Sequence, residues 1–140
     1  MQHNVRPLAS LIVRRDVHTH LNLQHHGIGD RVAKMYASSM KDLPMISHIN
    51  LKDNKLTDKG LSPLLKAIAI MPSLQFLDLS MNDVDAKAAA ALAKYLGGSS
   101  CPLLHLTINN ADIDDAECHK FVTALSHNTT LLTLNMGVCI

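Results

Sequence analysis

Nine histidines are the most conspicuous groups of this chain that can bind a metal or titrate near neutral pH. His20 and His48 are 28 residues apart, and Asp53 and Asp78 stand where a repeating fold would bring carboxylates beside them. A zinc site needs three or four ligands that converge on one point, whereas side chains in a column on a curved sheet diverge. The sequence therefore predicts no metal site. Stacked histidines resist simultaneous protonation, which instead predicts a surface sensitive to pH.

No motif for nucleophilic, nucleotide-dependent or metal-dependent catalysis occurs in the sequence, which lacks GxSxG, a P-loop, HExxH and GxGxxG. Cys118 and His119 are neighbours, but side chains one residue apart on a helix do not face each other. We therefore expect Cys118 to pack beneath a repeat or at a helix edge. The sequence predicts a protein that is not an enzyme, with no catalytic residue and no cofactor.

Composition excludes several further classes of function. The 140 residues have a formal net charge of +1, which predicts neither nucleic acid nor an anionic membrane as partner. Three cysteines without a CxxC pair are too few for a disulfide framework and fit a reducing compartment. No signal peptide and no run of eighteen apolar residues is visible. By elimination we expect a cytoplasmic protein.

An apolar pattern that recurs every 28 or 29 residues organises the chain. Its clearest instance has the spacing LxxLxLxxNxL, and consists of Ile46, Ile49, Leu51, Asn54 and Leu56. Four further instances share this register: Leu21, Leu23 and Ile28; Leu74, Leu77, Leu79, Asn82 and Val84; Leu103, Leu106, Ile108 and Ile113; and Leu131, Leu134 and Met136. The asparagine is replaced by His26, Ala111 and Cys139 in the units that lack it. Five instances in one register predict a repeat protein.

The second half of each unit has helical spacing. Apolar pairs four residues apart recur at fixed offsets: Leu8 and Ile12, Tyr36 and Met40, Leu64 and Ile68, Leu92 and Leu96, Phe121 and Leu125. The fourth and sixth positions of LxxLxL point to one side of a short strand, where they meet this helical stripe. A single coil cannot bury that face alone, so stacked coils are required. The strands then form a parallel sheet on the concave face, with helices on the convex face.

Local signals support this arrangement. Asp58, Asp85 and Asp114 are expected to cap the incoming helices, with Ser62-Pro63 as a second helix start. Gly97-Gly98 is expected to end the third helix. The two asparagines, Asn54 and Asn82, are expected to turn inward and bond to backbone groups of adjacent coils.

These residues resemble the ribonuclease-inhibitor-like class of leucine-rich repeat proteins, which includes ribonuclease inhibitor, the Ran GTPase-activating protein, tropomodulin and the repeat arrays of NOD-like receptors. The resemblance covers roughly residues 17–140 and implies an α/β solenoid. Four full units begin near residues 18, 46, 74 and 103, and a partial unit begins at residue 131. Residues 1–16 are expected to form an N-terminal helix, a partial repeat or a cap.

The sequence departs from the family pattern in two respects. The asparagine is missing at His26 and Ala111, where Asn110 is expected to compensate in part. The last three residues, 138–140, follow a strand without a covering helix, which indicates a fragment, a truncated product or an oligomerising edge. An exposed parallel edge predicts self-association of the chain.

The resemblance and the pattern together predict a surface for a partner. Side chains between the core positions of the strands would face the concave side in columns about 4.8 Å apart. The column positions are His20, His48, Phe76, His105 and Thr133; Asn22, Asn50, Asp78, Thr107 and Asn135; Gln24, Lys52, Ser80, Asn109 and Gly137; and His25, Asp53, Met81, Asn110 and Val138. Phe76, with Met81 close by, is an exposed apolar anchor among polar residues, a composition typical of binding hot spots.

We therefore predict a non-catalytic module that binds another protein through its concave face. The predicted partner-binding residues are His20, His48, Phe76, His105, Asn50, Lys52, Asp78 and Met81. Two alternatives remain open at this point. One is a GTPase-activating protein of the Ran type, which the resemblance alone suggests. The other is a structural segment that docks onto further repeats or a cytoskeletal assembly.

Overall fold

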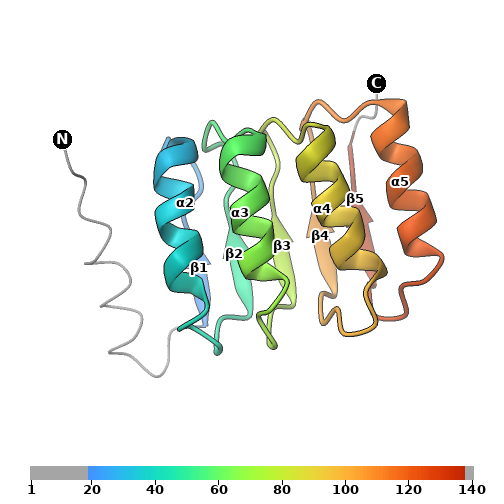
Figure 1. Ribbon diagram of the computed structural model, residues 1–140, viewed down its shortest axis with the longest axis horizontal. Helices are drawn as coiled ribbons and strands as arrows, with labels where there is room; N and C mark the ends of the chain where they lie inside the picture. The colour runs from blue at the N-terminus through green and yellow to red at the C-terminus, as the bar shows by residue number, and fades with distance from the viewer. Residues whose placement is uncertain (1–18, 138–140) are drawn as a thin grey trace.

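The computed structural model describes residues 19–137, in which five strands alternate with four helices (Figure 1). The strands are β1 (His20–Asn22), β2 (His48–Asn50), β3 (Phe76–Asp78), β4 (His105–Thr107) and β5 (Thr133–Asn135). The helices are α2 (Gly29–Met40), α3 (Asp58–Ile68), α4 (Ala86–Gly97) and α5 (Asp115–Leu125). The expected N-terminal segment 1–16 and the final residues 138–140 lie outside the described residues.

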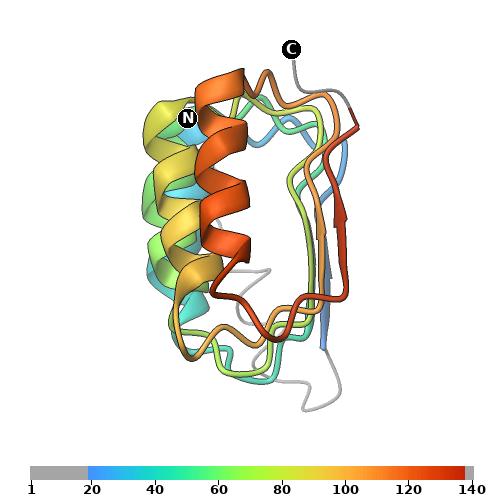
Figure 2. The same ribbon diagram turned by 90° about the vertical axis from the view of Figure 1, so that its right-hand side faces the viewer.

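The strands pair in chain order as one parallel sheet, β1-β2-β3-β4-β5. The pairing register joins equivalent repeat positions, so that His48 lies between His20 and Phe76. Viewed along the stack in Figure 2, the sheet forms one layer and the helices form the other. The predicted α/β leucine-rich repeat solenoid is therefore confirmed.

The core follows the repeat pattern closely. The middle residue of each of the first four strands is buried, and Leu51, Leu79 and Ile108 two positions later are completely buried. The predicted helical stripe meets them from the other layer, with Leu64 and Phe121 both buried. Each coil thus closes its apolar face against its own helix and against the coils on either side.

Two asparagines stabilise the turns after the second and third strands. Asn82 is buried, and its Nδ2 donates to backbone carbonyl oxygens of its own and the preceding coil at 2.9 to 3.2 Å. Its Oδ1 accepts hydrogen bonds from the backbone N–H groups of Asn54 and Leu56, both at 3.1 Å. Asn54 repeats the same pattern one coil earlier. The predicted inward orientation of both asparagines is confirmed.

The substitutes for asparagine do not continue this ladder. His26 is exposed, and its Nδ1 bonds to the Gln24 carbonyl within its own coil. Ala111 is buried but has no polar side chain to offer. Asn110 is exposed and adopts a left-handed backbone with φ of 51°, so the expected compensation by Asn110 is wrong.

The helix starts agree with the sequence only in part. Asp114 caps α5 in a capping box with Glu117, whereas Asp85 precedes α4 without a side-chain cap bond. The prediction that Asp58 caps α3 is wrong, because Thr57 is the N-cap residue. Ser62-Pro63 is not a helix start either, because Pro63 lies inside α3. The end of α4 at Gly97 is as predicted.

Asp58 instead connects successive coils. Its Oδ1 accepts a hydrogen bond from the backbone N–H of Ala88 in α4 at 2.9 Å. Asp30 in α2 does the same one coil earlier, since its Oδ1 and Oδ2 accept from the backbone N–H and hydroxyl of Thr57 at 2.8 and 2.7 Å. Carboxylates near the start of one helix therefore satisfy free donors at the start of the next.

Candidate functional site

The outward side of the sheet gathers most of the predicted site residues. Because the middle residue of each of the first four strands is buried, its two neighbours project away from the helices. We call this face the sheet surface. Its first row is His20, His48, Phe76, His105 and Thr133, and its second row is Asn22, Asn50, Asp78, Thr107 and Asn135. The other two predicted residues, Lys52 and Met81, follow β2 and β3 in the loops at the carboxyl ends of the strands.

Three rings stack along the first row. The imidazoles of His20 and His48 are 3.9 Å apart between centroids and inclined by 17°. The ring of Phe76 lies 5.6 Å from that of His48 at 21°. We call His20, His48 and Phe76 the ring stack. Phe76 is half-buried rather than fully exposed, because its ring packs on this neighbour. The result is a row of three stacked rings on the sheet surface, of which Phe76 is the apolar member.

The two stacked imidazoles are oriented by hydroxyl groups of the preceding residues. Nδ1 of His20 is 2.8 Å from Oγ1 of Thr19, and Nδ1 of His48 is 2.8 Å from Oγ of Ser47. Farther along the row, Nδ1 of His105 is 2.7 Å from Oγ1 of Thr133 on β5. Since Nδ1 is engaged in all three residues, Nε2 is the ring nitrogen left to meet a ligand.

The pKa of His48 is expected to lie below that of a free histidine. Partial burial lowers it most, and repulsion from His20 and His105 lowers it further. The folded chain thus favours neutral His48, so this contribution to stability is present above pH 6.5 and lost as the pH falls through the lower folded pKa.

NMR titration of the imidazole signals measures the pKa of His48. Replacing His20 with Asn should raise the His48 pKa, and a wild-type value at or above 6.5 would contradict the stacking argument.

Asn50 and Asp78 in the second row have a structural role that the sequence pattern did not predict. Oδ1 of Asn50 accepts a hydrogen bond from the backbone N–H of Lys52 at 3.0 Å. Asp78 forms the same contact with the N–H of Ser80 at 2.9 Å. Such bonds to the residue two positions later define Asx turns, in which Asp and Asn are common. Asn50 and Asp78 therefore end their strands, and Nδ2 of Asn50 also donates a hydrogen bond to Oε1 of Gln24 in the preceding coil at 3.3 Å.

The third row of predicted surface residues, which includes Gln24, Lys52, Ser80 and Asn109, is not uniformly exposed. Ser80, which was expected on the surface, is buried at 2% exposure, and its hydroxyl oxygen accepts a hydrogen bond from the backbone N–H of Asn109 at 3.0 Å. Lys52 at the equivalent position is half-buried. Beside it, Asp53 pairs with His25 across neighbouring coils, with 2.8 Å between Oδ2 and Nδ1. Both partners of this pair are largely exposed, so its contribution to stability is small.

The described residues of the fourth row have a left-handed backbone. His25, Asp53, Met81 and Asn110 all have positive φ angles, between 51° and 59°. Asn and Asp tolerate this conformation, but a side chain as bulky as methionine is unfavourable there. Met81 belongs to the same coil as Phe76 and is 44% exposed. An apolar side chain that remains in water contributes little to the stability of the fold. Met81 is thus an exposed apolar side chain on a backbone conformation that the repeat imposes at this position of each coil.

Metal ligands and thiols are the other groups of the described residues that could carry chemistry, and the Cys118 thiol is engaged in a disulfide. Within residues 19–137, no group of three His, Cys, Asp or Glu side chains is placed to hold a metal ion. Cys118 is partly buried and packs against the core, as expected, while His119 next to it is exposed.

Comparison with known proteins agrees with the repeat architecture. The family model described as Leucine Rich repeat matches residues 19–32, 43–65 and 71–93. These stretches contain β1, β2 and β3 together with much of the helices that follow β2 and β3. No curated protein sequence matches the chain significantly.

Solved structures share the fold. One of them is the tropomodulin C-terminal domain from Caenorhabditis elegans, with a TM-score of 0.78. The match covers 97% of this chain and 84% of that one at 15% sequence identity, so it is a likeness of fold. None of the helices within residues 19–137 is long and apolar enough to span a membrane.

Proposed function

We propose, from the premise that this chain is a leucine-rich repeat solenoid, that it is a non-catalytic module which binds another protein through the sheet surface. Stacked repeats of this kind form an extended concave surface, and such surfaces are what repeat proteins use for binding. The contact would centre on the ring stack and Met81, with His105, Asn50, Asp78 and Lys52 around them. The partner would approach from the side opposite to the helices.

The ring stack is the observation that carries this proposal. A protein interface typically has an apolar or aromatic centre surrounded by polar groups that hydrogen-bond at its rim. Phe76 and His48 form such a centre, since their rings are stacked and held in place by the sheet register. The neighbouring second row supplies amide and carboxylate oxygens at fixed positions. Preorganised side chains lose little conformational entropy when a partner binds.

Affinity capture with paired variants tests the proposal. The immobilised chain is incubated with an extract of the cells that produce it, in parallel with Phe76→Ala and Lys34→Glu. Lys34 is exposed on α2, on the opposite layer from the ring stack. A protein retained by the wild type and by Lys34→Glu, but lost with Phe76→Ala, supports binding through the sheet surface. A protein retained equally by all three excludes it.

A structural role is a second candidate, favoured by the last described coil. Leu132 and Val122 are 71% and 65% exposed, and β5 forms the last strand of the described sheet. Exposed apolar residues beside a sheet edge are typical of a face that another coil covers. The tropomodulin C-terminal domain is one of the solved structures that share the fold, which fits a structural repeat segment. On this alternative the chain associates with itself or with further repeats through this edge.

Sedimentation velocity of Leu132→Glu tests the edge. If the last coil mediates self-association, wild-type chain at high concentration sediments as a dimer or larger species, and Leu132→Glu sediments as a monomer. Ile70→Glu is the matched control, because Ile70 is 68% exposed but follows α3 rather than preceding β5. Monomeric wild type at all concentrations, or equal dissociation by both variants, would argue against an associating edge.

A further inference from the structure

Two imidazoles lie in direct contact at the start of the ring stack. The rings of His20 and His48 are 3.9 Å apart between centroids and nearly parallel, and Phe76 continues the row beyond His48. Two cations held at this separation repel each other, so a pair of stacked imidazoles resists a second proton. The assembled ring stack therefore belongs to a state in which at least one of the two histidines is neutral.

Hydroxyl contacts hold the two imidazoles in equivalent orientations. Nδ1 of His20 is 2.8 Å from the hydroxyl of Thr19, and Nδ1 of His48 is 2.8 Å from the hydroxyl of Ser47. The two histidines also occupy paired positions on neighbouring strands. Two positive charges on these rings would therefore lie side by side, and they could separate only if the hydroxyl contacts or the stacking were lost.

The charges around His48 do not offset this repulsion. Among the described residues, the ionisable groups on or beside this part of the sheet surface are His20 on β1, Lys52 after β2, Asp78 on β3, His105 on β4 and the His25–Asp53 pair. Partial burial lowers the pKa of His48 most, and the charges of His20 and His105 lower it further. Lys52 adds positive charge, and the Asp78 carboxylate already accepts a hydrogen bond from a backbone N–H group.

A partner over the ring stack would make a charge there still less favourable. A protonated imidazole carries a hydrogen on both nitrogens, and with Nδ1 engaged by a hydroxyl group its Nε2–H requires water or an acceptor. A partner that packs against Phe76 removes water from the neighbouring rings, and desolvation disfavours the charged form of histidine. By linkage, protonation of these rings then opposes binding.

We propose that the ring stack is an acid-sensitive switch: the sheet surface binds its partner while at least one of His20 and His48 is neutral, and releases it when both are protonated. The doubly charged pair opens the stack and removes the ordered ring that supports Phe76. This inference rests on the proposed binding function and adds the regulation of the same site. Binding is strong at neutral pH and lost on acidification.

NMR of the free chain tests the opening of the stack without a partner. Nuclear Overhauser effects between the rings of His20 and His48, and between those of His48 and Phe76, should be present at neutral pH. They should disappear once both imidazoles have titrated, while circular dichroism shows that the chain stays folded. A stack that persists after both have titrated, or that loses no contact before the chain unfolds, would overturn the proposal.

Calorimetry with the captured protein tests the release. Wild-type affinity should be at least tenfold lower at about pH 5 than at about pH 7.5, because each proton that binding must expel weakens it about tenfold per pH unit below the pKa. His48→Phe and His20→Phe each keep a ring but cannot take up the second proton, so each should bring this ratio to about threefold or less. His119→Gln removes an exposed histidine from α5, on the helical layer, and should keep the wild-type ratio.

The outcomes separate this switch from the binding function. Capture that is lost with Phe76→Ala but has equal affinity at both pH values, or higher affinity at the lower pH, supports the site and overturns the switch. A wild-type ratio in both phenylalanine variants assigns the pH dependence to other groups and also overturns it. Capture that does not depend on Phe76 contradicts the proposed function itself.

Discussion

Replacing Asn82 with alanine is expected to lower the free energy of unfolding by about 3 kcal/mol. The Asn82 side chain makes five hydrogen bonds with backbone groups of its own coil and of the coil before it. Alanine leaves the buried N–H groups of Asn54 and Leu56 without acceptors, and each such group costs about 1–3 kcal/mol. Water cannot easily compensate, because Asn54 and Leu56 are both fully buried. Urea denaturation followed by circular dichroism measures the change.

Asn135→Ala is the matched control for this prediction. Asn135 is an exposed asparagine at the end of β5, so its replacement should change stability by less than about 0.5 kcal/mol. If the Asn82 and Asn135 variants unfold at the same urea concentration, the asparagine contacts do not stabilise the stack, and the coils are held by their leucines alone.

Phe76→Ala is expected to weaken partner binding by about 30-fold or more, because truncating a hot-spot residue typically costs at least about 2 kcal/mol. Loss of the ring removes the centre of the ring stack and frees the His48 imidazole on that side. The unfolding free energy should fall by less than about 1 kcal/mol, since Phe76 lies on the sheet surface and is only half-buried. Isothermal titration calorimetry with the captured protein measures the affinity, and urea denaturation measures the stability.

Met81→Asn separates contact from strain in the same experiment. Asparagine tolerates the left-handed backbone at position 81, where φ is 58°, better than methionine does. This variant should be as stable as the wild type or more so, yet bind the partner less tightly.

Phe76→Ala has a contradicting outcome of its own. A large loss of stability with unchanged affinity for the partner would show that Phe76 belongs to the core rather than to an interface.

The repeat made the fold predictable from sequence. Each leucine of LxxLxL has one position in the coil, and the period of 28 or 29 residues fixes which residues pair across strands. Because five copies of one pattern share a register, aligning them predicts which residues lie side by side in the rows of the sheet surface. Asn54 and Asn82 could be assigned for the same reason, since a buried amide at the end of a strand must satisfy neighbouring backbone groups.

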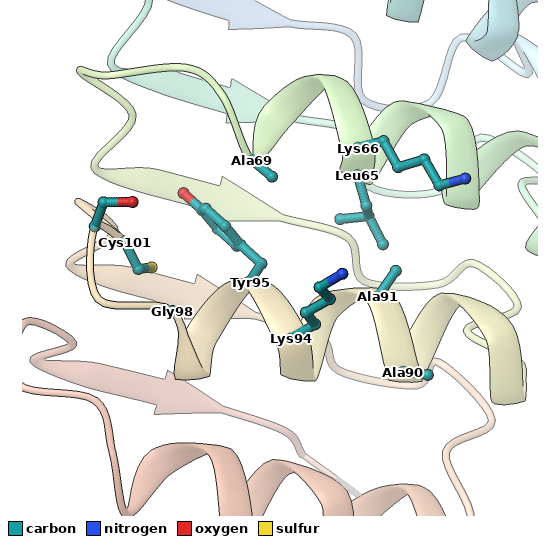
Figure 3. Close-up of a pocket in the computed structure, with 10 residues that line it drawn as sticks. Leu65, Lys66, Ala69, Ala90, Ala91, Lys94, Tyr95, Gly98 and Cys101 are labelled. Carbon is teal, nitrogen blue, oxygen red and sulfur yellow. The ribbon is translucent and has the colours of Figure 1, made fainter.

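Contacts between coils that depend on side-chain length were less predictable. Asp58 is a plausible N-cap in sequence, but Thr57 caps the helix and Asp58 reaches forward to Ala88. Ser80 stands in an outward column, yet its small hydroxyl is buried beneath Asn109. The pocket between α3 and α4 (Figure 3) was not predicted, because its shape depends on how the side chains of two different helices meet.

Side-chain NMR of the free and bound chain tests most directly whether a protein partner covers the sheet surface. Met81 and Met35 are both exposed, at 44% and 42%, but Met81 follows β3 whereas Met35 lies on α2. On binding, the Met81 methyl signal and the His48 imidazole signal should shift or broaden while the Met35 signal stays unchanged. A shift of the Met35 signal with unaltered Met81 and His48 signals would place the partner on the helices and contradict the account.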